Sequence, residues 1–450
     1  MTDVLSLTEE VAAFLVATRP DNLSPPVVDA AKYYTLDWLG SAIAGMATDP
    51  GRILLDYAAS QGDGPATVIG LEKKRCPETA ALANGGLSHI VEMDDLHRAS
   101  IVHPAAPVIP AALAVAERED ASGLDFLTAV VLGYEIAIRI GEAVGKSHYR
   151  FWHNTSTCGA FGAAAAAGWL LGLTAEQMVW ALGNAGTMAA GLWEFNADGA
   201  MSKHLHAGRA AASGVLSANL ARNGFTGARR ILEGERGFFA ATSRDAEPAR
   251  VTSGLAHGMS DYRISGVSIK PYASCRHTHS AIDAALLVRT HIGFAPEKID
   301  GVEVQTYQAA LALTDNSAPS HPYAAKFSMQ YCVASALWRG SVSLSDFHPA
   351  AINDPGVCAL VRRVHLKHST RIEQRYPTTW PARVTVKLED GQVLTETVSF
   401  PKGDPENPLS WDELESKFCK LVSGKWCEAQ AKELVERVRN LDRERRIRVL

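Results

Sequence analysis

Apolar side chains recur every three to four residues over most of the first 260 positions, which is the spacing of helices with one buried face. One helix is predicted after Ser24-Pro25-Pro26, because this tripeptide supplies an N-cap and prolines at the first helical positions. A capping-box pattern at 174–177 opens a second helix, and 122–145 predicts a third. Alanine and glycine are dense at 160–168 and 208–218, which favours helices whose backbones pack closely.

The pattern changes to alternating apolar and polar residues after Tyr262. Asp390-Gly391 separates two alternating runs, and an Asp-Gly pair in this position strongly predicts a tight β-hairpin. Helical stretches lie between the alternating runs, so this region is predicted to be a smaller α+β unit. Its expected elements are strands at 302–306, 384–388 and 393–397 and helices at 280–291 and 326–338.

The helical pattern returns from Trp411 to Leu441. We infer that these C-terminal helices rejoin the N-terminal ones and that the α+β unit is an insertion. The predicted fold class is mainly α, with a large all-helical domain built from both chain termini. Its first part is residues 1–263 and its C-terminal part residues 401–450, and the inserted α+β domain is residues 264–400.

The charge balance argues against a nucleic-acid partner. The chain has 450 residues with 44 Lys plus Arg and 49 Asp plus Glu, a net charge of −5, whereas nucleic-acid binding needs clustered positive charge. Seven cysteines without paired spacing suit a reducing compartment better than a disulfide framework. The first residues are acidic, unlike a signal peptide, and the apolar run at 158–173 is too short to span a bilayer. We therefore expect a cytoplasmic protein with no membrane partner.

Familiar cofactor motifs are missing from the sequence, including the dinucleotide-binding, P-loop, serine-elbow and zincin patterns. Four polar clusters stand out instead within apolar sequence. The first runs from Glu92 to Pro104 and contains Asp94, His97 and His103. It can present an imidazole to a cleft, but a solvated acidic turn explains it equally well, and a metal site would lack a recognisable ligand spacing.

The second and third clusters each contain a basic residue beside an Ala-rich helix. His153, preceded by Tyr149, lies just before a helix whose free N–H groups favour anions, although a hydrogen-bonded structural histidine is an equal alternative. Lys203 and His206 share a helical face, as residues three apart do. A lysine on a packed face is unusual, and its alternative is a side chain that reaches the edge of the bundle.

The fourth cluster lies where the α+β unit begins and contains Lys270, Cys275, Arg276 and His277. If this segment were extended, Cys275, His277 and His279 would lie on one side and offer a soft metal site, but the neighbouring cations oppose it. An anion site is the more natural interpretation, because Lys270 and Arg276 form a compact positive patch.

These clusters, in this order, resemble the MmgE/PrpD family, which includes 2-methylcitrate dehydratase, cis-aconitate decarboxylase and iminodisuccinate epimerase. The resemblance covers nearly the whole chain. It is carried by the M-D-D…H-P loop of Met93 to Pro104, the run from His153 to Ala167, S-K-x-L-H-x-G-[KR]-A-A from Ser202, K-x-[YF]…T-H-x-x-[IV]-D-A from Lys270 to Ala284, and Ala-Lys326-Phe-Ser328.

The resemblance implies a helical domain, an α+β lid, a homodimer, and an active site between the domains without metal or cofactor. The family's catalytic residues fall on His103, His153, Lys203 and Lys270. Cys275 stands where the cis-aconitate decarboxylases carry a lid histidine, and Glu92 and Leu96 stand at their acidic-loop Asp and Thr. Further substrate-binding residues are assigned to Asp94, His97, Tyr149, Cys275, Arg276 and His277.

The family's substrates are small di- or tricarboxylates, and the shared step makes or quenches a carbanion next to a carboxylate. We expect Lys203 and Lys270 to bind carboxylates while His103 and His153 exchange protons. The favoured reaction is a lyase reaction, hydration or dehydration of a citrate-like acid. The alternative is an epimerase of an amino-dicarboxylate such as iminodisuccinate, using His103 with Lys270 or Tyr149 on opposite faces. A third hypothesis is a catalytically inactive, anion-binding dimer.

Overall fold

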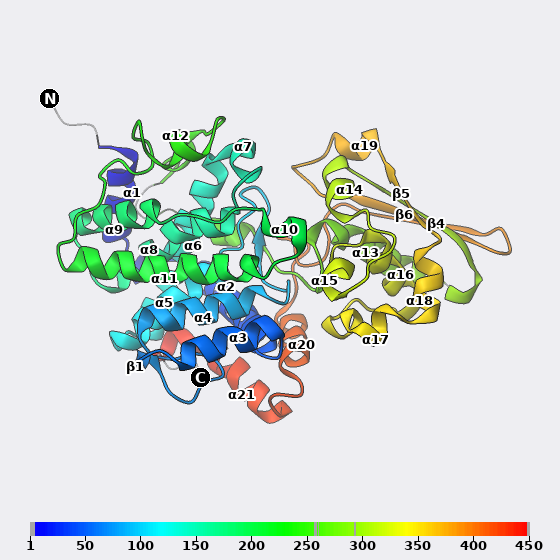
Figure 1. Ribbon diagram of the computed structural model, residues 1–450, viewed down its shortest axis with the longest axis horizontal. Coiled ribbons are helices and arrows are strands. Elements are labelled where there is room, and N and C mark those ends of the chain that lie inside the picture. The colour runs from blue at the N-terminus through cyan, green and yellow to red at the C-terminus, as the bar shows by residue number, and fades with distance from the viewer. Residues whose placement is uncertain (1–4, 256–258, 260, 292–293, 448–450) are drawn as a thin grey trace. The chain divides into compact units, whose positions relative to one another are not determined.

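The computed structural model describes residues 5–255, 259, 261–291 and 294–447, so the ends of the predicted domains at 1–4 and 448–450 lie outside the described residues. The chain forms two compact units (Figure 1). We call Met1–Ser268 with Ser410–Leu450 the helical unit, and Ile269–Leu409 the inserted unit. Helices dominate the described chain and strands are few, which confirms the predicted mainly α class.

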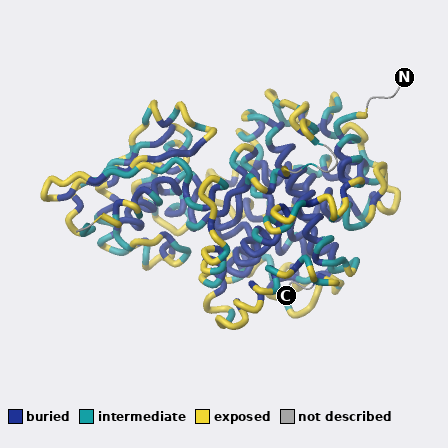
Figure 2. The backbone as a smooth tube through the Cα atoms, turned by 180° about the vertical axis from the view of Figure 1, so that it is seen from behind, coloured by how far each residue is buried: buried dark blue, intermediate teal, exposed yellow. Residues whose placement is uncertain are grey.

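The core of the helical unit is a set of long helices with small residues at their contacts. Helices α4, α5, α6, α8 and α11 pack on one another, and α8 is buried over almost its whole length. Figure 2 shows that buried backbone is concentrated in the interior of this unit. Close approach requires glycine: a Cβ added at Gly208 on α11 would overlap Leu82 O on α4. The bounds of these helices are Pro77–His89 (α4), Ala105–Arg118 (α5), Gly123–Ala143 (α6), Asn154–Leu170 (α8) and Ser202–Arg222 (α11).

Three helix starts predicted from the sequence are confirmed. Helix α2 spans Pro25–Gly45 directly after Ser24. Helix α9 spans Ala175–Thr187 behind the expected capping box, in which Gln177 N donates to Thr174 Oγ1 at 3.2 Å. Ser122 caps α6 in the same way. The other helices and strand of this unit are α1 (Leu7–Ala17), α3 (Asp49–Ala59), β1 (Asp63–Ala66), α7 (Gly145–Tyr149), α10 (Phe195–Asp198) and α12 (Phe238–Thr242).

The C-terminal residues form two helices, α20 (Trp411–Val422) and α21 (Glu428–Arg439), with Ser423 ending the first. Both pack on α2 of the helical unit. Phe418 of α20 is 1% exposed and sits over Gly40 of α2, where an added Cβ would lie 3.1 Å from its ring.

A short antiparallel ribbon belongs to the same unit. Strand β2 (Leu96–His97) pairs with β3 (Val267–Ser268), so that Leu96 lies opposite Ser268. The Tyr34 hydroxyl of α2 donates to Val267 O at 2.6 Å. The acidic loop of the first polar cluster is therefore hydrogen-bonded to the last residues before the inserted unit.

The inserted unit is built on a four-stranded sheet with the order β5-β4-β6-β7. Strands β6 (Ala382–Leu388) and β7 (Val393–Val398) form the hairpin predicted from Asp390-Gly391. Strand β4 (Ile299–Thr306) pairs antiparallel with β6, and β5 (Val364–His368), which the sequence analysis missed, pairs parallel with β4. The helices are α13 (His279–Arg289), which packs on β6 and β7, α14 (Gln308–Thr314), α15 (Pro322–Lys326), α16 (Met329–Arg339), α17 (Pro349–Ile352), α18 (Pro355–Val361) and α19 (Thr370–Glu373).

Among the described residues, none of the helices combines the length and the apolar character needed to cross a lipid bilayer.

Candidate active site

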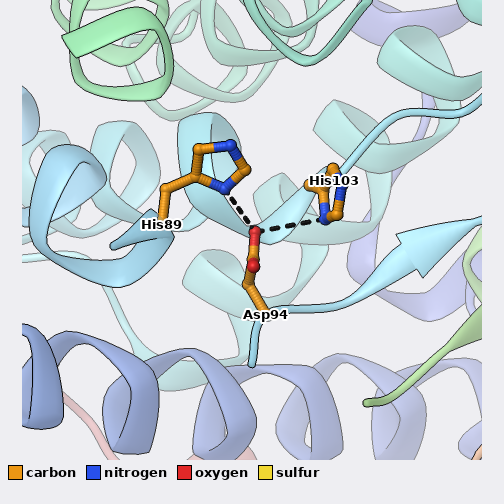
Figure 3. Close-up of side chains that lie close together, drawn as sticks. All are labelled: His89, Asp94 and His103. Atoms are coloured by element: carbon orange, nitrogen blue, oxygen red, sulfur yellow. Dashed lines mark hydrogen bonds and ion pairs between the residues drawn. The ribbon is translucent and has the colours of Figure 1, made fainter. Parts of the chain in front are cut away.

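Asp94 lies between two imidazoles in the helical unit (Figure 3). Its Oδ2 is 2.6 Å from His89 Nδ1 and 3.2 Å from His103 Nδ1. The side chains of Asp94 and His89 are fully buried, and that of His103 is 12% exposed. A carboxylate shared by two imidazoles orients both rings at once.

This geometry selects the tautomer of His89. A carboxylate oxygen accepts hydrogen bonds, so Nδ1 of His89 donates to Asp94 and the lone pair of the neutral ring is placed on Nε2. His103 Nδ1 lies at ion-pair distance from the same oxygen. His89 Nε2 is buried and has no hydrogen-bond partner within the described part of the chain. Proton-accepting nitrogens held in place by a buried carboxylate are typical of general-base catalysis.

Three segments of the chain deliver these side chains. His89 is the last residue of α4, Asp94 belongs to the loop that follows, and His103 lies two residues before α5. Asp95 accepts from Ala105 N at 3.1 Å and so caps α5. Burial raises the pKa of Asp95 well above its usual value, and the neighbouring charge of Asp94 raises it further. Next to the shared carboxylate there is thus a carboxyl that favours its neutral form.

His153 extends the cluster to a third imidazole. Its ring stacks on His89 with centroids 5.4 Å apart, and its Nδ1 is 3.3 Å from Nδ1 of His206. Burial lowers the pKa of His153 well below its usual value, and the nearby His89 and Lys203 lower it further. For the same reasons the pKa of His206 falls to about 4. Both rings are therefore neutral at physiological pH.

Lys203 supplies a buried cation beside these rings. It is 6% exposed, lies in the first turn of α11, and forms an ion pair with Glu92 of the acidic loop. The sequence analysis assigned Lys203 to a substrate carboxylate and did not identify Glu92 as its partner. The pair with Glu92 holds the Lys203 ammonium beside the acidic loop.

The same three side chains, His89, Asp94 and His103, are the group in the described residues whose ligand atoms lie close enough for a metal ion, within 4.8 Å of one another. Two ligand atoms of a tetrahedral zinc ion are separated by about 3.3 Å, given Zn–N distances of about 2.0–2.1 Å. The 2.6 Å between His89 Nδ1 and Asp94 Oδ2 is shorter than this edge and matches a charge-assisted hydrogen bond. This spacing fits a shared proton better than a shared metal.

Two other residues named from the sequence lie in the helical unit with partners of their own. His97 is on β2, its Nδ1 is 3.0 Å from Ser100 Oγ, and burial lowers its pKa to about 3. Tyr149 packs edge-on against Trp193 at 5.2 Å, and Trp193 in turn contacts the ring of His153 at 4.9 Å. Tyr149 therefore reaches the cluster through Trp193.

The remaining predicted residues belong to the inserted unit. Lys270 is 1% exposed, and Cys275 N donates to Lys326 O at 2.9 Å. Arg276 forms a buried ion pair with Asp404. His277 stacks on Trp380 at 4.4 Å, its Nδ1 is 2.7 Å from the Tyr307 hydroxyl, and burial lowers its pKa to about 4.

The alternative of a metal site formed by Cys275, His277 and His279 is wrong. Residues Arg276–Thr278 form a 3₁₀ helix that runs into α13, so the segment is not extended and these side chains do not alternate on one side. His279 Nδ1 instead lies 2.8 Å from Arg276 Nη1.

Sequence reasoning missed His89, the residue closest to Asp94 in this cluster. His89 lies only three residues before Glu92, at the end of a helix whose preceding residues are mostly small or apolar. A basic residue at a helix C-terminus is ordinarily explained by the helix dipole, so the position alone did not indicate a functional residue. The sequence feature that could have identified His89 is its position close to the acidic loop.

Comparison with known proteins covers both units. Residues 9–251 match the MmgE/PrpD N-terminal domain, and residues 272–443 match the MmgE/PrpD C-terminal domain. A cis-aconitate decarboxylase-like protein, oryM, from Aspergillus oryzae is 28% identical over 447 residues, covering 93% of this chain and 91% of that protein. The cis-aconitate decarboxylase of Homo sapiens is 28% identical over 457 residues, covering 97% and 92%. The 2-methylcitrate dehydratase of Cupriavidus necator is 26% identical over 248 residues, covering 52% and 50%.

Proposed function

This chain belongs to the MmgE/PrpD family, and we propose that it is a cofactor-independent lyase that dehydrates or hydrates a small citrate-like tricarboxylate. The observation that carries the proposal is the carboxylate of Asp94 shared by His89 and His103, which places an oriented proton acceptor in a buried cluster. Relatives named cis-aconitate decarboxylase and 2-methylcitrate dehydratase support a lyase that acts on such acids.

In the proposed reaction, His103 acts as the general base. Its Nε2 removes a proton from the carbon next to a substrate carboxylate, and the electron pair of that C–H bond forms the alkene as the β-C–O bond breaks. The imidazolium returns its proton to the departing hydroxide, which leaves as water. The carboxylate of Asp94, 3.2 Å from His103 Nδ1, stabilises the imidazolium that forms.

The negative charge of the enolate-like intermediate needs fixed cations, and we assign this role to Lys203 and Lys270. Lys203 is buried and anchored by Glu92, so it is oriented before substrate arrives. Lys270 is assigned on the family resemblance.

A second candidate is decarboxylation of a cis-aconitate-like acid. It is favoured by the coverage of the comparisons, because the decarboxylases match 91% or more of their own length whereas the Cupriavidus dehydratase matches 50%. In this reaction the electron pair of the broken C–C bond stays at carbon when CO₂ leaves, and carbon then gains a proton in place of the carboxylate. An epimerase of an amino-dicarboxylate remains the alternative outside the lyases.

The experiment is incubation of the purified protein with citrate, 2-methylcitrate, cis-aconitate and an amino-dicarboxylate in D₂O, followed by proton NMR. Dehydration creates an alkene signal, decarboxylation incorporates deuterium with loss of CO₂, and epimerisation exchanges the α-proton without an alkene. We expect alkene formation or its reversal, and we expect dialysis against EDTA to leave the rate unchanged. Turnover of none of the acids would contradict the proposal.

Two variants test the assigned roles. His103→Gln and Asp94→Asn are expected to lower kcat by about 10²–10⁴-fold, the usual range for losing a proton-transfer group. His368→Gln is the matched control, because the His368 side chain is 41% exposed and pairs at the surface with Glu373. Variants of His103 and Asp94 that keep near-normal turnover would overturn this mechanism.

A further inference from the structure

We propose that Lys417, on the C-terminal helix α20, is a positioning residue for Asp94, and that Asp37 on α2 holds Lys417 in place. This inference rests on the proposed function, because it assigns Lys417 the task of fixing the loop that carries the shared carboxylate. Helix α20 lies more than 300 residues after that loop in the sequence.

The contacts of Lys417 join three segments of the helical unit. Its Nζ donates to Met93 O at 2.7 Å and forms an ion pair with Asp37. Lys417 is 8% exposed and Asp37 is 2% exposed. Burying an ammonium is costly unless a counter-charge accompanies it, and Asp37 supplies that charge. The pair therefore delivers a strong, charge-assisted donor to one backbone carbonyl of the loop.

That carbonyl lies next to a residue of the loop with a strained backbone. Met93 lies between Glu92 and Asp94, and Glu92 has φ of +60°, a left-handed conformation unfavourable for a residue with a side chain. Such backbone strain costs about 1–3 kcal/mol and persists only where surrounding contacts hold it. The carbonyl of Met93 is part of the peptide group that joins Met93 to Asp94. The hydrogen bond from Lys417 therefore fixes the orientation of this peptide group and of the backbone that enters Asp94.

Lys203 restrains the same strained residue from the other end, through the Glu92 side chain. The loop is thus held at two successive residues, by one lysine on α11 and one on α20. Without the second restraint, the peptide before Asp94 can rotate and the carboxylate loses its place between His89 and His103. Distances of 2.6 and 3.2 Å leave little tolerance for such a rotation.

A purely structural role makes a different prediction, and Lys32 allows the two to be separated. Lys32 is also buried, at 7% exposure, and lies on α2. It also ties α2 to the C-terminal region, through ion pairs with Asp29 at 3.0 Å and Asp442 at 2.8 Å. Neither of these two ion pairs involves the acidic loop. Lys32→Met is therefore the matched control for Lys417→Met.

The first measurement is steady-state kinetics at a temperature where urea titration shows every variant folded. Lys417→Met is expected to lower kcat at least tenfold with KM changed less than about threefold, whereas Lys32→Met keeps kcat within about twofold at a similar loss of urea midpoint. Lys417→Arg, which keeps the cation, is expected to recover most of the lost kcat. Equal kcat losses in Lys417→Met and Lys32→Met, or no loss in either, would overturn the proposal.

The second measurement does not depend on turnover. Hydrogen–deuterium exchange followed by mass spectrometry should show faster exchange in the peptide that covers residues 91–97 of Lys417→Met, and unchanged exchange there in Lys32→Met. If no polycarboxylate is turned over but this difference appears, the proposed function fails and the positioning role stands. If Lys417→Met does not fold, Asp37→Asn carries the same comparison, and unchanged exchange in Asp37→Asn would contradict the proposal.

Discussion

His148 shows how a buried histidine couples the stability of the helical unit to pH. It is fully buried, with Nε2 2.8 Å from Thr157 Oγ1 and Nδ1 3.0 Å from Thr242 Oγ1. Burial lowers its pKa to about 4. In the unfolded chain the same ring titrates near 6.5, so below that pH the unfolded state binds a proton that the folded state refuses. The stability that depends on neutral His148 is complete above pH 6.5 and is lost as pH falls toward 4.

We therefore predict that His148→Gln weakens the pH dependence of unfolding. Between pH 7 and 5, His148 should account for roughly 2 kcal/mol of lost stability, from 1.36 kcal/mol per pH unit below 6.5. Urea denaturation gives the free energy of unfolding of each protein at pH 7 and pH 5. The loss between the two pH values in the wild type, minus the loss in the variant, is the contribution of His148. Glutamine retains polar atoms for the two threonines but cannot titrate. If the free energy of unfolding changed equally with pH in the two proteins, the prediction would fail, because folding would then leave the pKa of His148 unchanged.

At the residue scale, His103, His153 and Lys203 were named from the sequence because polar groups interrupt apolar runs there. The structure places His103 beside Asp94, His153 against His89 and Lys203 against Glu92. The sequence did not indicate these pairings. That Lys203 meets Glu92 depends on how α11 crosses the acidic loop, and more than 100 residues separate them in the sequence. Residue types and local spacing indicate which groups need partners but not which partners they obtain.

At the scale of elements, the crossing of α4 and α11 positions two members of the cluster. Helix α4 ends in His89, and α11 carries Lys203 in its first turn. Gly208 lies at the crossing, where an added Cβ would overlap Leu82 O, and the Cα of Gly208 would lie 3.0 Å from a Cβ added at Gly85. Backbone atoms cannot move aside as a flexible side chain can, so a methyl group here must push the helices apart.

Gly208→Ala is accordingly predicted to destabilise the protein by about 1–3 kcal/mol, the usual cost of overpacking, despite alanine's better helix propensity. It should also lower kcat at temperatures where the variant is folded, because Lys203 moves relative to His89. Gly62→Ala is the control, since nothing lies within 4 Å of its added Cβ. Thermal unfolding and steady-state kinetics are the measurements. If the Gly208→Ala protein were as stable and active as Gly62→Ala, the contact between α4 and α11 would accommodate a methyl group and this prediction would be wrong.

Elements with local signals were predictable and those without were not. The capping box at Thr174 and the Asp390-Gly391 hairpin each depend on neighbouring residues alone, and both formed as expected. Strand β5 escaped notice because it is short and mostly exposed, and its partner β4 lies about 60 residues earlier. The segment after Cys275 was considered as a strand, but it forms a 3₁₀ turn that leads into α13.

For the whole molecule, the limits of the inserted unit depend on long-range contacts, which a pattern along the sequence does not show. Changes in periodicity placed the insertion at 264–400, whereas the compact unit runs from 269 to 409. At its start, Val267 and Ser268 pair with the acidic loop of the helical unit. At its end, a Pro- and Asp-containing segment looks like a linker, yet Gly403 accepts from Ile269 N at 2.8 Å and Asp404 pairs with Arg276. Both limits are set by long-range pairing.

Because residues near the two ends of the inserted unit bond to each other, we predict that residues 269–409 fold when expressed alone. The unit is of ordinary domain size, about 100–150 residues, and has its own sheet with α13 packed on it. A fragment of residues 264–400 is the matched comparison, because it lacks Asp404 and leaves the buried Arg276 without that partner, at a cost of about 3–5 kcal/mol. Far-UV circular dichroism during urea titration should show a cooperative transition for 269–409 at a clearly higher midpoint. Equal midpoints would show that the Arg276–Asp404 pair does not define the unit, and an unfolded 269–409 fragment would show that its core depends on the helical unit.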